Sequence, residues 1–303
     1  MATLNHSYVS KIVWMLEACL FGAVSAAARS VPVDSASKFG AWLFPRLGPL
    51  TPAHRVAARN LRLVFPEASD AEINHLLRAQ WAELGRTAAE YTVLDRIVAD
   101  PGRVQVEGAE RLAAIAAGAG PVVFISGHFS NFELMPAAII KAGVDCQITY
   151  RAMNNPIVDR MVRENRFRYG VRLFAPKGLD GARELMRGLG RGESVALMND
   201  QKFNGGIAAP LFAHLAHTAP GPATFALRFG IPIQPMSVQR VGDTARFKVI
   251  VHEPIVLADT GDRTADIETG VRRINAFIED RVRARPTEWF WVHKRWPGEM
   301  YRD

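Results

Sequence analysis

The sequence predicts an α/β fold, in which a central, mostly parallel sheet is flanked by helices and preceded by an N-terminal helical membrane-associating region. Two observations predict it. An apolar stretch and a capped helix occupy the first hundred residues, and from about residue 103 short apolar runs alternate with helical stretches. The 303 residues are 49% hydrophobic, enough for a sizeable core. We therefore expect an N-terminal region over 1–100 and an α/β domain over 101–303.

The first element is an apolar stretch over residues 12–28, which Lys11 and Arg29 flank and in which Glu17 is the only charged residue. A membrane-spanning helix needs about 20 apolar residues, and a charge near its centre costs about 2.5 to 3.5 kcal/mol. We therefore expect a retained helix that lies in, or dips into, the membrane interface. A cleaved signal peptide is the alternative, and Glu17 breaks the apolar run that such a peptide needs.

An amphipathic helix is predicted over residues 70–94. Ser69 and Glu72 form a capping box at its start, and apolar side chains then recur at helical spacing. These are Ile73, Leu76, Leu77, Trp81, Leu84, Ala88 and Tyr91.

The sheet and its helices are predicted from the alternating pattern that follows. Apolar runs indicate strands over residues 122–125, 146–150, 194–198, 233–237 and 247–251. Helices are expected over 156–169, 180–190, 220–229 and 266–284. Pro156 suits the first turn of one helix and Gly170 its end. Strands that alternate with helices pair in parallel, which gives the mostly parallel sheet.

Charge and cysteine content limit the classes of partner. A net charge of +7 and a pI near 9.7 favour anionic partners, among them lipid headgroups, acidic carrier proteins and nucleic acid. No nucleic-acid-binding motif accompanies the charge, so we do not expect nucleic acid. Cys19 and Cys146 lie far apart and outside any metal-ligand pattern, which disfavours a disulfide framework and a zinc site. A reducing compartment fits this cysteine usage.

The most informative segment reads VVFISGHFSNFELM, over residues 122–135. A buried strand ends at Gly127, and Ser130 or Asn131 is a good N-cap for a following helix. On one continuous helix His128 and Glu133 would point about 140° apart, so they can meet only if His128 precedes the helix. In that arrangement His128 would be a general base and Glu133 would orient its ring.

Polar clusters follow three of the predicted strands. They are His128, residues 151–155 and residues 199–202. Because ligands of open α/β sheets bind beyond the carboxyl ends of the strands, we expect these clusters to meet at one edge.

Several ordered motifs together resemble a known family. They are GHFSNFE at 127–133, YRAMNNP at 150–156, NDQ at 199–201, PLF at 210–212 and WFWVHKRW at 289–296. With these motifs the chain resembles the lipid A biosynthesis acyltransferases, the lauroyl and myristoyl transferases of the broader glycerolipid acyltransferase superfamily. His128 and Glu133 match the catalytic HxxxxD/E pair of that family.

The resemblance implies a reaction and a location. A fatty acyl chain would pass from an acyl carrier protein thioester to the hydroxyl of a 3-hydroxyacyl chain on a Kdo-bearing lipid A precursor, a late step of lipopolysaccharide biosynthesis. The enzyme would work at the cytoplasmic face of the bacterial inner membrane, without a metal, nucleotide or redox cofactor. Neither cysteine lies in the motif and Ser130 lacks a GxSxG elbow, which favours direct transfer without an acyl-enzyme.

Seven further residues are substrate-binding candidates: Arg151, Asn154, Asn155, Arg160, Arg163, Asp200 and Gln201. The 151–155 cluster suits phosphate or sugar oxygens, and its alternative role is to cap the helix that begins at Pro156. The arginines suit lipid phosphates or the carrier protein, and their alternative is a solvated helix face. Asp200 and Gln201 would hold the acceptor or brace the 151–155 loop, unless their hydrogen bonds are purely structural.

The WFWVHKRW motif mixes aromatic and basic side chains, and we expect part of it to form a rim at the membrane interface. Two rival functions stay open. One is acylation of another glycolipid or a lysophospholipid, with acyl-CoA or acyl carrier protein as donor. The other is a catalytically silent membrane-binding protein. A metal hydrolase would need a third ligand, for which the sequence offers no plausible residue.

Overall fold

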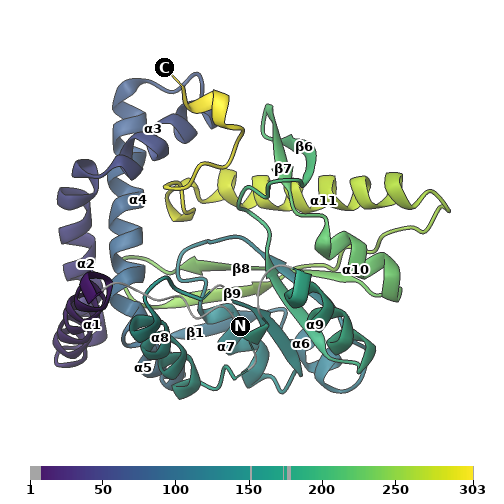
Figure 1. Cartoon of the computed structure of the whole chain (residues 1–303), viewed down its shortest axis with the longest axis horizontal. Coiled ribbons are helices and arrows are strands. Elements are labelled where there is room, and N and C mark those ends of the chain that lie inside the picture. Colours follow the sequence, from purple (N-terminus) through teal and green to yellow (C-terminus); the bar gives the residue numbers. More distant parts are fainter. Residues whose placement is uncertain (1–7, 151, 173, 176–178, 303) are drawn as a thin grey trace.

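The computed structural model describes residues 8–150, 152–172, 174–175 and 179–302. Five helices form the N-terminal part: α1 (Tyr8–Arg29), α2 (Val33–Leu47), α3 (Pro52–Val64), α4 (Asp70–Tyr91) and α5 (Leu94–Ala99). In Figure 1, α1, α2, α3 and α4 gather at one side of the molecule, beside the sheet. The predicted capping box of α4 is confirmed, because Ser69 and Glu72 exchange both hydrogen bonds.

A seven-stranded sheet forms the centre, and its order is β1-β9-β8-β2-β5-β3-β4. The strands are β1 (Val104–Glu107), β2 (Val123–Ser126), β3 (Cys146–Thr149), β4 (Phe174–Ala175), β5 (Ser194–Met198), β8 (Ile233–Arg240) and β9 (Phe247–Val251). Neighbours pair in parallel except β8 with β9. The predicted fold class is therefore confirmed, and the five predicted strands lie within a few residues of their expected bounds.

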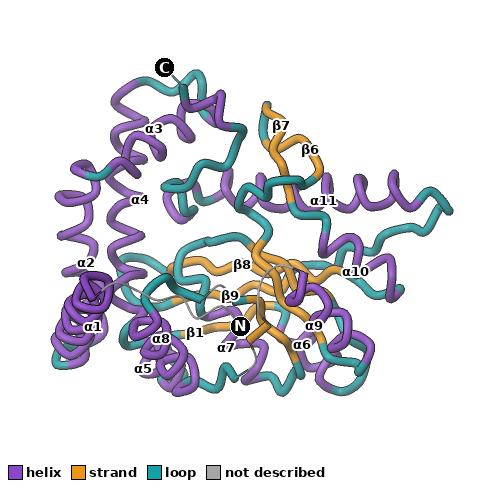
Figure 2. The backbone as a smooth tube through the Cα atoms, in the orientation of Figure 1, coloured by secondary structure: helices purple, strands orange, loops and turns teal. Residues whose placement is uncertain are grey.

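Helices cover both faces of the sheet (Figure 2). They are α6 (Ala109–Ala116), α7 (Leu134–Lys141), α8 (Pro156–Arg168), α9 (Leu179–Gly190), α10 (Gly221–Phe229) and α11 (Arg263–Ala284). Successive residues of β2 face opposite ways, so Phe124 joins the core under α5 and α7, while Val123 and Ile125 pack toward α9, α10 and α11. Both faces of β2 are thus buried, as its apolar run predicts.

The N-terminal helices pack tightly because glycines remove the side chains between them. A Cβ at Gly40 of α2 would lie 2.1 Å from the carbonyl oxygen of Gly85 in α4, and one at Gly48 would lie 2.2 Å from the ring of Trp81. Only glycine permits this separation, which fixes α2 along α4.

A hairpin of β6 (Ile207–Leu211) and β7 (His214–Thr218) forms a separate two-stranded sheet. It packs with α3, α4, the end of α11 and the 289–296 segment in a second core, where Leu61, Leu77, Leu211 and Trp291 are buried. The sequence did not predict this hairpin, in which Pro210 interrupts a run of small residues. The N-terminal helices and the C-terminal segment therefore share one apolar core.

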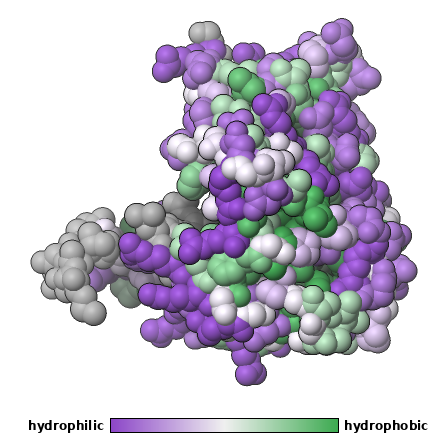
Figure 3. Space-filling model, turned by 90° about the vertical axis from the view of Figure 1, so that its right-hand side faces the viewer, coloured by the Kyte–Doolittle hydropathy of each residue, from purple (hydrophilic) through white to green (hydrophobic). Residues whose placement is uncertain are grey.

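The surface of α1 is unusually apolar. Within this helix, Ser10–Arg29 is long and apolar enough to cross a membrane by length and composition, and only 6% of its most apolar window is buried. Ile12, Leu16 and Leu20 are more than half exposed. The face on the right of Figure 1 is more mixed than the surface of α1. Figure 3 shows hydrophobic side chains gathered near the middle of this face and hydrophilic ones around its upper and outer margins.

Candidate functional site

His128 lies just beyond the carboxyl end of β2, in the loop that leads to α7. The preceding Gly127 leaves room for Phe129 and Asp200, because a Cβ there would lie 2.8 Å from the ring of Phe129 and 3.2 Å from the Cβ of Asp200. The His128 side chain is 18% exposed. Its ring meets the edge of Phe132, with centroids 4.7 Å apart. The imidazole is therefore partly enclosed at the edge of the sheet where ligands of such folds bind.

Asp200 is the carboxylate that contacts His128. Its Oδ1 lies 2.8 Å from Nδ1 of His128, and its Oδ2 accepts the backbone N–H of His128 at 2.7 Å. Asp200 follows β5, which pairs in parallel with β2, so both residues emerge at the same edge. A carboxylate only accepts hydrogen bonds, so the hydrogen-bond network assigns the proton to Nδ1 and leaves the Nε2 lone pair available. That tautomer is the one that a general base requires.

Asp200 is held ionised by its surroundings. Its side chain is fully buried, and the indole N–H of Trp289 donates to Oδ2 at 2.9 Å. Burial by itself would raise the pKa of Asp200. The charge that His128 carries when it is protonated, together with the hydrogen bonds that it donates, outweighs burial, and the pKa of Asp200 lies below its usual range. The carboxylate is thus available to stabilise a protonated imidazole.

The 289–296 segment supports Asp200 from within the core. Trp289, Trp291, Trp296 and Arg295 are at most 2% exposed, so the expectation that this motif forms a membrane-interface rim is wrong for them. They fill the core between α3, α4 and the β6–β7 hairpin, where large aromatic side chains bury the most apolar area. Phe290 stays partly exposed and faces His128, with ring centroids 5.9 Å apart.

The structure corrects the predicted partner of His128. Glu133 is also buried, but its polar contacts among the described residues go elsewhere. Its Oε1 pairs with Nη2 of Arg166 at 2.5 Å, and its Oε2 accepts Nε of Arg166 at 3.0 Å and the hydroxyl of Tyr169 at 3.1 Å. Glu133 thereby links the β2–α7 loop to α8, and Asp200 instead is the carboxylate in hydrogen-bond contact with His128.

The path of the loop explains this difference. The helix predicted to begin near Ser130 or Asn131 begins at Leu134, with Glu133 as its N-cap residue. Ser130 instead adopts a positive φ of 45°, which turns the chain before the helix starts. Phe132 then covers the imidazole and Glu133 points toward α8.

The 151–155 cluster divides into different roles. Arg151 lies outside the described residues. Asn154 is exposed. Asn155 is the N-cap of α8, where its Oδ1 accepts the N–H of Ile157 at 2.9 Å. Its Nδ2 donates to Glu17 at 2.8 Å, so the one acidic residue of the apolar α1 is satisfied by α8. Both polar atoms of Asn155 are thus engaged in capping and in helix docking.

The remaining candidates differ in exposure. Arg160 is exposed on α8, and Arg163 is half exposed with its Nε 3.6 Å from Asp159. Gln201 is exposed beside the buried Asp200. These three side chains are therefore accessible to a ligand, whereas Asp200 is fully buried.

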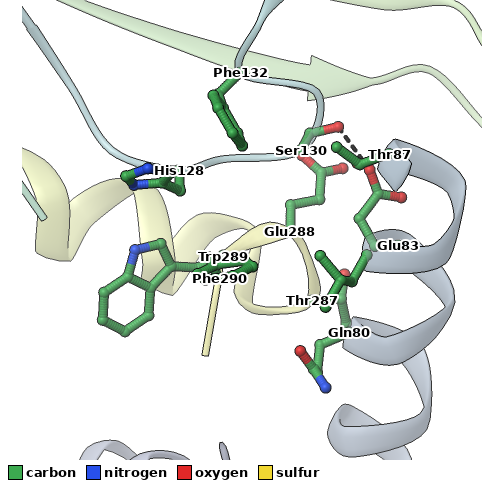
Figure 4. A pocket seen from close by; sticks show the side chains of 11 residues that line it. Gln80, Glu83, Thr87, His128, Ser130, Phe132, Thr287, Glu288, Trp289 and Phe290 are labelled. Carbon is green, nitrogen blue, oxygen red and sulfur yellow. Dashed lines mark hydrogen bonds between the residues drawn. The ribbon is translucent and has the colours of Figure 1, made fainter. Parts of the chain in front are cut away.

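A narrow pocket opens beside His128 (Figure 4). It has room for about one water molecule, with a free volume near 20 Å³. His128, Phe132, Trp289 and Phe290 lie at one end in Figure 4, and polar side chains from α4 line the other. The full lining is Gln80, Glu83, Leu84, Thr87, His128, Ser130, Phe132, Thr287, Glu288, Trp289 and Phe290.

Among the described residues, the serine and cysteine side chains considered as nucleophiles are engaged elsewhere or lie away from His128. The Oγ of Ser130 donates to Glu83 at 2.7 Å. Cys146 is buried, which raises the pKa of its thiol, and Cys19 lies on the exposed surface of α1. Among the described residues, no group of three or more His, Cys, Asp or Glu side chains is arranged to hold a metal ion.

Two contributors to the site escaped the sequence analysis. The sequence identifies Trp289 only as part of the 289–296 motif, and it identifies Glu83 only as a residue of the helix predicted over 70–94. The roles of both depend on contacts across more than 40 residues of chain, Trp289 with Asp200 and Glu83 with Ser130. The position of Asp200 after a strand predicts a site residue. From the sequence we expect it to contact the acceptor or the 151–155 loop, whereas in the structure it contacts His128.

Comparison with known proteins places this geometry in context. Residues 6–297 match the family described as bacterial lipid A biosynthesis acyltransferase. The Escherichia coli K12 lipid A biosynthesis lauroyltransferase is 24% identical over 250 residues, which cover 80% of this chain and 78% of that protein. The palmitoleoyltransferase of the same strain is 24% identical over 248 residues, 79% of this chain and 77% of that protein. The lipid A biosynthesis myristoyltransferase of the same strain is 24% identical over 258 residues, which cover 82% of this chain and 77% of that protein.

Proposed function

Since this chain belongs to the bacterial lipid A biosynthesis acyltransferase family and is therefore an acyltransferase, we propose that it transfers a fatty acyl chain from acyl carrier protein to a hydroxyl of a Kdo-bearing lipid A precursor. We propose His128 as the general base and Asp200 as the carboxylate that orients it. One observation carries this assignment: Nδ1 of His128 is bonded to the buried Asp200, which leaves Nε2 to accept a proton.

The proposed reaction is a direct acyl transfer. Nε2 of His128 takes the proton of the acceptor hydroxyl as that oxygen attacks the thioester carbonyl. The tetrahedral intermediate then breaks its carbon–sulfur bond, and the protonated imidazole returns the proton to the leaving thiolate. The ionised Asp200 stabilises the imidazolium between these two steps. The occupied Ser130 hydroxyl supports a route without an acyl-enzyme.

Substrate binding is proposed for the accessible polar residues near this edge. The exposed Arg160 and Arg163 on α8 would meet phosphates of the acceptor or acidic side chains of the carrier protein. Asn154 and Gln201 would donate to sugar or phosphate oxygens. The three relatives are equally similar to this chain and are named for three different acyl groups, so identity does not select a chain length.

We propose that the enzyme works at the cytoplasmic face of the inner membrane, held by α1. The support is the exposed apolar surface of α1 and its continuation on α2, where Phe39 and Trp42 are 59% and 52% exposed. Arg46 lies over the ring of Trp42, which places a cation at the same surface. Deletion of residues 1–30 should release the protein from the membrane fraction, and an undiminished membrane fraction would refute the anchor.

The test is mass spectrometry of a Kdo-lipid A precursor incubated with purified protein and acyl carrier thioesters. Wild-type protein should add the mass of one acyl chain, and folded His128→Ala should not. His75→Ala changes an exposed histidine of α4 and should behave like wild type. If no thioester gives a mass gain, the acceptor assignment is wrong. Parallel reactions with acyl-CoA and with lysophospholipid would then detect the rival reaction.

A further inference from the structure

Ser130, two residues after His128, has a backbone conformation that serine rarely adopts. Its φ is 45°, in the left-handed region. Such a conformation is strained for a residue with a Cβ and persists only where the surroundings hold it. The contacts of Ser130 therefore show what fixes the loop that carries His128.

Three hydrogen bonds hold the loop just beyond His128. The backbone N–H of Ser130 donates to the carbonyl oxygen of Glu288 at 2.7 Å. The Oγ of Ser130 donates to Oε1 of Glu83 at 2.7 Å, the bond drawn in Figure 4. The side-chain amide of Asn131 donates to Oε2 of Glu90 at 3.1 Å. Glu83 and Glu90 are seven residues apart on α4 and so lie on one face of that helix.

Arg240 joins these two glutamates. It ends β8, the neighbour of β2 in the sheet, and its side chain is 3% exposed. Its Nε lies 2.7 Å from Oε2 of Glu83 and its Nη1 lies 2.5 Å from Oε1 of Glu90. Nη2 donates to both carboxylates, at 2.8 and 3.0 Å. A planar guanidinium can hold two carboxylates in this fixed geometry, whereas an ammonium group cannot.

Charge makes the arrangement depend on Arg240. The Glu90 side chain is fully buried and that of Glu83 is 12% exposed. Removal of the guanidinium that binds both of them would leave two carboxylates close together in the interior, where like charges repel strongly. Their hydrogen bonds to Ser130 and Asn131 would then be lost or displaced.

We propose that Arg240 is a positioning residue for acyl transfer, which acts through Glu83 and Glu90 to hold the Ser130–Asn131 turn and with it the reactive placement of His128. This inference rests on the proposed function. Arg240 touches neither substrate, so its loss changes the turnover number and leaves substrate affinity nearly unchanged. A misplacement of about 1 Å at a reacting group can lower turnover about 100-fold.

The first experiment compares Arg240→Lys with Arg103→Lys. Arg103 makes an equivalent forked pair with Asp34 and also donates to the carbonyl oxygen of Ala245, away from the His128 loop. We expect Arg240→Lys to lower kcat per folded molecule by about 10- to 100-fold, with KM for both substrates within about twofold of wild type. Arg103→Lys should lower the melting temperature without changing kcat.

A second set of variants keeps the test decisive if Arg240→Lys does not fold. Ser130→Ala removes the hydroxyl link, and Glu83→Gln keeps an acceptor for Ser130 but removes the charge that Arg240 binds. If both act through one link, the double variant should lose no more kcat than the worse single variant.

Three results would overturn the inference: wild-type kcat in folded Arg240→Lys, an effect confined to KM, or additive losses in the double variant. A wild-type protein that transfers no acyl chain would instead refute the proposed function, which keeps the two failures distinct.

Discussion

Two buried carboxylates, Asp200 and Glu133, lie near His128 in space or in sequence and have different partners. Asp200 follows β5, contacts the imidazole and receives the indole N–H of Trp289. Glu133 precedes α7 in the same short motif as His128, yet it pairs with Arg166 of α8. The carboxylate that is 72 residues away in sequence is the one in contact. Proximity along the chain therefore does not decide which carboxylate contacts His128. The parallel pairing of β2 and β5 brings Asp200 to it.

The two carboxylates also differ in what their loss should do. In the proposed mechanism Asp200 bonds to a side chain that changes protonation during the reaction, so its negative charge matters most in the transition state. Glu133 bonds to an arginine that stays charged throughout, so its negative charge matters mainly for folding and for the placement of α8. Substitution of each residue separates these roles.

The largest effect is expected for Asp200→Asn. An asparagine amide can donate to Nδ1, which would shift the proton to Nε2 and abolish the base. We expect kcat to fall by on the order of 10³ to 10⁴-fold, with little change in KM, in the acyl-transfer assay. Asp180→Asn, an exposed change on α9, is the control. A loss below about tenfold would mean that Asp200 does not orient His128.

For Glu133→Gln we expect the opposite balance. The guanidinium of Arg166 is 15% exposed and would lose the charge of Glu133 while it stays largely buried, so the free energy of unfolding should fall by about 3 kcal/mol. Chemical denaturation measures this loss, and kcat of the folded fraction should fall less than in Asp200→Asn. Glu184→Gln, at the surface of α9, should leave stability unchanged. Loss of kcat equal to that of Asp200→Asn at unchanged stability would restore Glu133 as the catalytic partner.

The contrast between Asp200 and Glu133 shows which structural features the sequence predicts and which it does not. Periodicity and turn residues located the strands and helices that carry local signals, among them 194–198 and 247–251, which match β5 and β9. Polar residues after strands predict that His128 and Asp200 lie at one edge of the sheet, and in the structure they are in contact there. The hydrogen bond of His128 to Asp200 instead of Glu133 was not predicted, because Ser130 takes a left-handed conformation that a side-chain pattern does not reveal.

The C-terminal motif shows a second limit of sequence reasoning. A mixture of tryptophans and cations suits a membrane interface as well as a core, and composition cannot separate the two. Burial depends on α3, α4 and the β6–β7 hairpin, which close over Trp291 and Arg295 from distant parts of the chain. Within this core, Trp289 acquires its contact with Asp200.

A smaller effect should follow from Trp289→Phe, which removes the N–H donor to Asp200 and keeps most of the aromatic volume. A hydrogen bond to a charged group contributes about 1.5 to 3 kcal/mol, of which part should appear as a loss of about tenfold in kcat. Trp291→Phe is a matched control, because its indole donates to the carbonyl oxygen of Pro286 at 2.6 Å and not to Asp200. Equal kcat in the two variants would show that the Trp289 bond serves packing alone.

The smallest effect concerns His252, a second histidine that the sheet partly buries but that bonds to a hydroxyl, Ser237 Oγ at 2.8 Å, instead of a carboxylate. Burial and, to a lesser extent, the charges of Arg281 and Arg111 together lower the pKa of His252 to about 4, against a smaller opposing effect of Glu107. The unfolded chain takes up this proton near pH 6.5 and the folded protein does not. Stability is therefore lost as the pH falls from about 6.5 toward about 4.

His252→Gln removes that proton uptake. Between pH 7 and pH 4.5 its melting temperature should fall by about 2 to 4 °C less than that of wild type, as measured by calorimetry. His75→Gln should follow wild type, since His75 is exposed. Acyl transfer at neutral pH should be unchanged in both variants, because His252 follows β9 and is separated from the His128 loop by β8. An identical pH dependence in wild type and His252→Gln would show that His252 does not titrate in this range. A histidine without a carboxylate partner would then not determine the acid stability of the fold.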